Sequence, residues 1–168
     1  MKWYSRFDEV VNNGDQSSFT LIKTVRFPVK LNKDLIDEKY GTLQGFGFDK
    51  VHIPNFSYEV TKHEIVYHIE FIKGTQLNPI SFMNHKKIIY ENLVDNDKEW
   101  GFHDLHPEDF IVEDNTNKLY LVDFESFEKM TFEEKVNDYN KNIKNILLNL
   151  DKIKKDLDTI HMNDFWKW

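Results

Sequence analysis

The chain has 168 residues, with 22 Lys and Arg against 29 Asp and Glu, a net charge of −7, and no cysteine. The negative charge argues against nucleic acid or an anionic membrane surface as the main partner, although a local basic cleft can still hold a phosphate. No stretch approaches the roughly 20 apolar residues that span a bilayer, and residues 1–8 lack the apolar run of a signal peptide. We therefore expect a soluble, cytoplasmic protein without disulfides and without a membrane span.

The N-terminal part of the chain has the alternation of a β-hairpin. Residues 3–11 and 18–27 are expected to pair, because Asn13-Gly14-Asp15 between them tolerates the positive φ of a tight turn at little cost. One face of the second strand is apolar apart from Lys23. A lysine in that position is either a solubilising residue at a sheet edge or a ligand-binding residue.

A helix and a second hairpin are expected next. The helix covers residues 32–43 and carries Glu38. It is followed by an expected loop that contains Gly41, Gly45 and Gly47. The second hairpin pairs residues 56–60 with residues 65–72, where apolar and polar side chains alternate. These elements predict a small antiparallel sheet with one helix.

The middle of the chain is expected to hold a helix over residues 79–93, which begins at a proline. Residues 101–110 are expected to form a loop crowded with polar side chains. A third, short hairpin pairs residues 110–112 with residues 119–122. Neither glycine nor proline occurs after Pro107, so the rest of the chain is expected to be mainly helical.

The last segment carries an apolar stripe with spacings of four and three residues, which is typical of a long amphipathic helix. The stripe consists of Phe132, Val136, Tyr139, Ile143, Ile146, Leu150, Ile153, Leu157 and Ile160. Thr131 and Glu134 have the spacing of a capping box at its start. Such a stripe fits packing on the protein's own core, and it also fits self-association through a coiled coil.

Three aspartates flank the third hairpin. Asp104 and Asp109 lie in the loop before it, and Asp123 follows its second strand, so the hairpin is expected to bring them together. Clustered carboxylates repel one another unless a cation lies among them. Magnesium prefers oxygen ligands and commonly keeps substrate phosphates in its shell. The pattern therefore predicts a hard cation, Mg²⁺, bound together with a phosphate.

Two motifs at these aspartates resemble those of the protein-kinase-like superfamily. The sequence D-L-H-P-E-D-F from Asp104 resembles the catalytic loop D-L-(K/H)-P-x-N-(I/F), and V-D-F-E at residues 122–125 resembles the D-F-G motif. His106 is similar to the histidine of aminoglycoside phosphotransferases and lipopolysaccharide-sugar kinases. The resemblance implies a minimal two-lobed α+β fold, with a β-rich N-lobe over residues 1–73 and a mainly helical C-lobe over residues 74–168 that contains the catalytic-loop hairpin.

The resemblance implies catalytic and metal-binding roles for the matching residues. Asp104 would orient the attacking hydroxyl and accept its proton, with His106 beside it in the loop. Asp123 would hold the Mg²⁺ ion that bridges the phosphates, and Asp109 would take the second metal position. Asp109 stands in the place of the usual asparagine.

The resemblance also implies how ATP would be held. Lys23 would contact the phosphates, and Glu38 would pair with Lys23 and fix its side chain. The segment from Glu70 onward resembles the hinge between the lobes, so the backbone of Glu70 and Ile72 would meet adenine.

The sequence departs from the kinase pattern at further places besides Asp109. Phe102 and His103 replace the first two residues of H-R-D. Glu125 replaces the glycine of D-F-G, no glycine-rich G-x-G-x-x-G motif precedes Lys23, and only residues 126–130 separate V-D-F-E from the last helix. No activation segment for peptide substrates fits in that space. We therefore expect an ATP- and Mg²⁺-dependent phosphotransferase that acts on a small hydroxyl-bearing acceptor such as a sugar.

Two other functions fit the same residues. A catalytically inactive kinase-like protein would hold a nucleotide or a protein partner without turnover. A divalent-metal phosphohydrolase would use the same carboxylates on phosphate esters.

Overall fold

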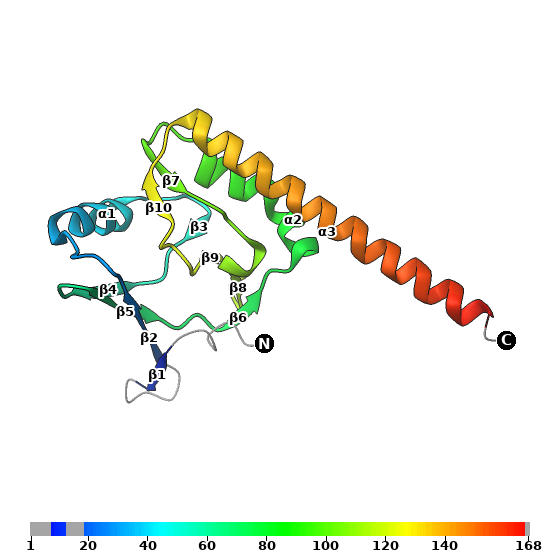
Figure 1. Ribbon diagram of the computed structural model, residues 1–168, viewed down its shortest axis with the longest axis horizontal. Coiled ribbons are helices and arrows are strands. Elements are labelled where there is room, and N and C mark those ends of the chain that lie inside the picture. The colour runs from blue at the N-terminus through cyan, green and yellow to red at the C-terminus, as the bar shows by residue number, and fades with distance from the viewer. Residues whose placement is uncertain (1–7, 13–18, 167–168) are drawn as a thin grey trace.

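The computed structural model describes residues 8–12 and 19–166 of the chain (Figure 1). In these residues the elements run β1-β2-α1-β3-β4-β5-β6-α2-β7-β8-β9-β10-α3, with a π-helical turn after α2 and a 3-10 turn before β8. The α+β class expected from the sequence is confirmed. The expected turn at Asn13-Gly14-Asp15 lies outside the described residues.

The first sheet is antiparallel and has the spatial order β1-β2-β5-β4. Its strands are β1 (Glu9–Asn12), β2 (Phe19–Arg26), β4 (Phe56–Val60) and β5 (Glu64–Glu70). Within the described residues both expected hairpins are confirmed, because β1 pairs with β2 and β4 pairs with β5. The face that carries Leu21 and Ile69 is buried, as the alternation predicted.

Helix α1 (Lys33–Gly45) lies against this sheet and is longer than the sequence suggested. Its N-cap is Asn32, whose side-chain oxygen accepts hydrogen bonds from the amides of Asp34 at 3.1 Å and Leu35 at 3.4 Å. The expectation of a loop at Gly41 and Gly45 is wrong. The burial of Tyr40 and Leu43 on either side of Gly41 outweighs the low helix propensity of glycine. The burial of Tyr40 and Leu43 shows that one face of α1 packs on the core.

Two further sheets form the middle of the molecule. Their strands are β3 (Val51–His52), β6 (Gly74–Gln76), β7 (Trp100–Phe102), β8 (Phe110–Glu113), β9 (Leu119–Leu121) and β10 (Phe127–Lys129). The sheet order is β3-β9-β8-β6, and β7 pairs with β10. The expected hairpin β8–β9 is confirmed, while β3, β6, β7 and β10 are additions. Part of the segment 101–110 is thus strand rather than loop.

Helix α2 (Pro79–Ile89) begins at a capping box and continues into a π-helical turn (Tyr90–Val94). The amide of Ser81 donates to the side chain of Asn78, and the amide of Asn78 donates to the hydroxyl of Ser81, both at 2.9 Å. The helix expected over residues 79–93 is confirmed, with a change of helical geometry in its last turn.

Helix α3 (Phe132–Trp166) is one continuous helix that runs alongside α2 and then past the rest of the molecule (Figure 1). Its capping box is confirmed, since the amide of Glu134 donates to the Thr131 hydroxyl at 3.1 Å. Lys135 is buried and donates to the Asn96 side chain at 2.9 Å, which fixes the first turn of the helix. None of the helices in the described residues combines the length and apolarity needed to cross a membrane.

The apolar stripe of α3 divides into two parts. Tyr139, Ile143, Ile146 and Leu150 pack on the protein's own core. Farther along, the exposed fractions of Ile153 and Leu157 are 46% and 51%. Packing on the core is therefore confirmed for the first part of the stripe only.

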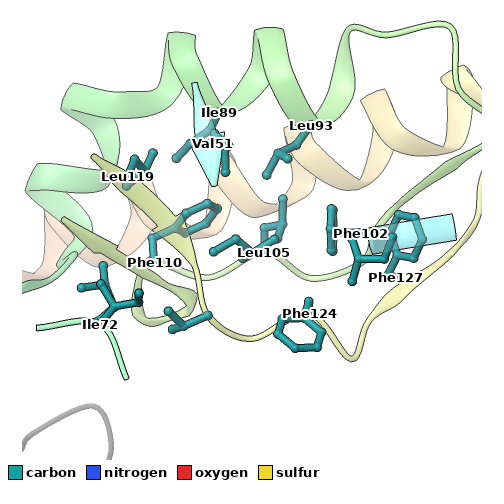
Figure 2. Close-up of a cluster of buried hydrophobic side chains, with 14 of the residues drawn as sticks. Val51, Ile72, Ile89, Leu93, Phe102, Leu105, Phe110, Leu119, Phe124 and Phe127 are labelled. Carbon is teal, nitrogen blue, oxygen red and sulfur yellow. The ribbon is translucent and has the colours of Figure 1, made fainter. Parts of the chain in front are cut away.

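One continuous apolar core joins these layers. Figure 2 shows Ile89 and Leu93 of the helical layer over Phe110, with Phe124 on the opposite side of the cluster. The rings of Phe124 and Phe56 lie 4.4 Å apart, which joins the segment after β9 to the first sheet. Each fully buried aromatic or aliphatic side chain of this kind contributes roughly 1.5–3 kcal/mol.

Alanine substitutions at two glycines should change the free energy of unfolding in opposite directions. A Cβ atom at Gly74 would overlap the carbonyl oxygen of Val112 on the neighbouring strand and lie 2.8 Å from a methyl carbon of Ile111. Gly74→Ala should therefore lower the free energy of unfolding by about 2 kcal/mol. Gly41→Ala, in a helix with nothing within 4 Å, should raise it by about 1 kcal/mol. Urea unfolding of both variants measures the difference, and equal shifts would contradict the close approach of β6 to β8.

Candidate functional site

The loop after β7 holds Asp104 in an unusual backbone conformation. Its φ is 49°, in the left-handed region that costs a non-glycine residue of order 1 kcal/mol. The Asp104 amide donates to a carboxylate oxygen of Asp138 on α3 at 3.0 Å, and the Asn142 side chain donates to the same oxygen at 3.2 Å. His103 lies between the carboxylates of Glu128 and Asp138. Helix α3 thus supports this loop through Asp138, which contacts both Asp104 and His103.

The rest of the loop is closed by Asp109. Its carboxylate accepts a hydrogen bond from the His106 amide at 2.8 Å across the 3-10 turn Pro107–Asp109, and the residue is 8% exposed. The Val122 amide donates to the Asp109 carbonyl at 2.8 Å. This bond ties the loop to the residue before Asp123, so the two sequence motifs lie side by side.

Lys23 of β2 reaches the segment after Asp123. Its ammonium group pairs with the Glu125 carboxylate at 2.7 Å. Lys39 of α1 donates to the backbone carbonyl of Glu125 from the other side. Burial lowers the pKa of Lys39 below its ordinary value, while the carboxylates of Glu125 and Glu128 act against that decrease. Two lysines from different elements therefore meet at Glu125.

The expected ion pair between Lys23 and Glu38 is not formed in the described residues. Glu38 pairs instead with Lys129 of β10 at 3.3 Å and is half exposed. The register of α1 turns Lys39, the next residue, toward the site. A shift of one position along a helix rotates the side chain by about 100°, which is enough to exchange the two.

The expected convergence of three carboxylates into a ready cation site is not seen either. No group of three or more His, Asp or Glu side chains among the described residues is arranged to hold a metal ion. The Asp109 carboxylate is directed at its own loop backbone, which explains part of this difference. Asp123 is half-buried between Val122 and Phe124.

The predicted adenine-binding residues lie where the first sheet joins the second. Glu70 ends β5, and its amide donates to the Asn55 carbonyl at 2.9 Å. Phe71, the next residue, donates its amide to the Phe19 carbonyl at 3.0 Å. Ile72 is buried in the core, just before β6. A role for the Glu70 and Ile72 backbone in binding adenine stays a prediction.

The space beside Lys23 is small. A cavity of about 10 Å³ is bounded there by Lys23, Tyr67, Ile69, Val122, Asp123, Phe124 and Glu125. Ligand cavities usually measure hundreds of cubic ångströms. His106 instead lines a separate cavity of about 210 Å³ with Glu108 and residues of α3. The structure thus brings Lys23 and Asp123 to one cavity and places His106 at another.

Comparison with known proteins gives no match, either to a protein-family model or to a curated protein. The kinase resemblance of the two motifs therefore stays a prediction.

Two contributors to the site, Lys39 and Asp138, were not found from the sequence, and Glu125 was singled out there without its pairing to Lys23. Glu125 follows V-D-F directly, so its position in the motif was a usable signal. Lys39 is adjacent to the predicted Glu38, and only the helix register separates them. Asp138 lies 34 residues from Asp104, and nothing in the local sequence connects the two.

Two tyrosines close the buried side of the site. The hydroxyl groups of Tyr40 and Tyr67 lie 2.6 Å apart, and both rings are buried. Burial raises the pKa of both phenols, that of Tyr67 to about 12. The nearby carboxylates of Glu125 and Asp123 act in the same direction.

This burial predicts a loss of stability at alkaline pH. The folded protein keeps the Tyr67 proton to a higher pH than the unfolded chain does, so its contribution is complete below pH about 10 and is lost toward pH about 12. In that window the free energy of unfolding should fall less steeply with pH in Tyr67→Phe than in the unmodified protein, by up to about 1.4 kcal/mol per pH unit. Urea unfolding at several pH values tests this. Below pH 9 the slopes should agree, and identical slopes above pH 10 would contradict the proposed protonation.

Proposed function

We propose that the protein is an ATP- and Mg²⁺-dependent phosphotransferase of two-lobed, kinase-like fold that acts on a small hydroxyl-bearing acceptor such as a sugar. The observation that carries the proposal is the ion pair between Lys23 and Glu125 at 2.7 Å. It places a lysine of the first sheet within two residues of Asp123. The backbone bond from Val122 to Asp109 supports the same assignment, because it sets the Asp104 loop against that segment.

The proposed reaction forms a bond between the acceptor oxygen and the terminal phosphorus of ATP. The bond from that phosphorus to the bridging oxygen breaks, and ADP leaves with the electron pair. Asp104 takes the proton of the acceptor hydroxyl, and Lys23 stabilises negative charge on the phosphates. When bound, Mg²⁺ would neutralise phosphate charge and align the groups.

The residues fit a magnesium ion that arrives with a nucleotide. Magnesium is commonly held by one or two carboxylates together with substrate phosphates, rather than by a complete set of protein ligands. Asp123 lines the cavity that Lys23 bounds, and the backbone bond holds Asp109 next to it. In this proposal Asp123 and Asp109 would hold the ion together with the phosphates, and the Asp109 carboxylate would have to turn away from the His106 amide.

A second candidate function is nucleotide binding without turnover. The cavity of about 10 Å³ and the pairing of Lys23 with Glu125 favour a site that is not ready for turnover, because phosphates must displace Glu125 to reach Lys23. A protein of this kind would respond to a nucleotide by a local rearrangement of the V-D-F-E segment.

Substitution of two aspartates tests the proposed reaction. Incubation with ATP, Mg²⁺ and a panel of sugars should yield ADP, and Asp104→Asn should reduce the rate at least about 100-fold while nucleotide affinity changes less than about twofold. Asp123→Ala should abolish Mg²⁺-dependent ATP binding in calorimetry. Asp114→Asn, an exposed aspartate in the β8–β9 turn, is the matched control.

The outcomes separate the candidate functions. Turnover retained in Asp104→Asn would overturn the assignment of the base. Binding of ATP without any ADP would favour the binding protein. Phosphate release from simple esters without ATP would indicate a phosphohydrolase.

A charge-neutralising substitution tests the role of Glu125. Glu125→Gln should raise ATP affinity by about fivefold, because an amide holds Lys23 less tightly than a carboxylate does. Glu38→Gln, which removes the partner of Lys129 instead, should leave the affinity within about twofold. The reverse result, a loss in Glu38→Gln with no effect in Glu125→Gln, would contradict the pairing seen in the structure.

A further inference from the structure

A much larger cavity lies beside Glu70, and none of the residues that line the small cavity at Lys23 belongs to it. Its volume is about 530 Å³, and it is enclosed by the end of α1, residues 46–56, the end of β5 and strand β9. The volume lies in the usual range for cavities that hold small ligands. No residue of the two kinase-like motifs lines it.

The walls of this cavity are rich in aromatic rings. The lining rings are those of Phe46, Phe48, His52, Phe56 and Tyr120. Phe46 and Phe48 meet edge to face at 5.5 Å, and His52 and Tyr120 lie 5.4 Å apart. Aromatic faces carry negative electrostatic potential and attract cations. The Phe46 ring already does so within the protein, because the Lys98 ammonium nitrogen lies 4.7 Å from its centroid.

The charged side chain in the lining also favours a cation. Among the described residues that line the cavity, Glu70 is the one Asp or Glu, and no Lys or Arg is present. The Glu70 carboxylate accepts long hydrogen bonds from the Asn55 amide at 3.4 Å and from the Asn55 side chain at 3.5 Å. Burial raises the pKa of Tyr120, and the carboxylates of Glu113 and Glu70 add to that increase.

The lining of this cavity shares no residue with the lining of the small cavity beside Lys23. Ile69 lines the small cavity with Lys23 and Asp123, whereas Glu70, the next residue, lines the large one. A ligand in the large cavity therefore contacts neither lysine.

We propose that this cavity binds a small organic cation, whose ammonium group lies against the aromatic rings and pairs with Glu70. Aromatic walls recognise quaternary ammonium groups in this way, and a single carboxylate adds the opposite charge. An anionic ligand would face Glu70 without a compensating lysine or arginine in the described lining. The proposal goes beyond nucleotide binding and does not depend on it.

The test compares choline with its neutral isostere, in which a tertiary-butyl group replaces the trimethylammonium group. Calorimetry on the full chain should show saturable choline binding that is at least about tenfold tighter than binding of the isostere. Glu70→Gln should weaken choline by about fivefold and leave the isostere unchanged. Glu59→Gln, on the neighbouring strand β4 and outside the cavity lining, is the matched control and should bind choline as the unmodified protein does.

Putrescine, with two primary ammonium groups, extends the test to less apolar cations. Saturable binding of putrescine that Glu70→Gln weakens would also support the proposal. Three results would overturn it: equal affinity for choline and its isostere, no effect of Glu70→Gln on any cation, or no saturable binding of either cation. Amide shifts of His52 and Tyr120 in nuclear magnetic resonance spectra locate the bound ligand, and shifts elsewhere would place it outside this cavity.

Discussion

The burial of Phe124 is the constraint on which the rest of the site depends. Its side chain is 1% exposed and contacts Tyr40 of α1 and Phe56 of β4, with ring centroids 6.3 Å and 4.4 Å away. The segment after β9 is therefore held against both the helix and the first sheet. Because Asp123 and Glu125 flank this ring, its packing determines where their carboxylates lie. An apolar contact thus positions the charged groups.

The charges around that ring are arranged in an unexpected way. Lys23 and Lys39 come from different elements, and both meet Glu125, one at its carboxylate and the other at its backbone carbonyl. Bringing Lys39 into the interior has a desolvation cost, which its lowered pKa reflects. The resemblance implied that α1 would supply an acid to Lys23. The helix supplies a lysine, and the acid comes from the residue after Phe124.

Elements with a strong local pattern were predicted well from the sequence. The long helix α3, its capping residues Thr131 and Glu134, and the alternation in β4 and β5 follow from local signals, and each is confirmed. The short strands β7 and β10 were not found, because each has three residues and they pair across residues far apart in the sequence. The exchange of Glu38 for Lys39 has a similar cause. A predicted helix gives the period but does not decide which of two adjacent polar residues faces the core.

Proximity of Asp104 to the V-D-F-E segment could be predicted, but its support could not. The hairpin β8–β9 is local, and it brings Asp109 beside Val122 as expected. The hydrogen bond from the Asp104 amide to Asp138 depends on how α3 packs across the loop, which no local pattern specifies. That bond offsets part of the strain of a left-handed aspartate. The packing of α3 therefore supports the conformation of Asp104, because the apolar stripe that holds the helix on the core also places Asp138 beside this loop.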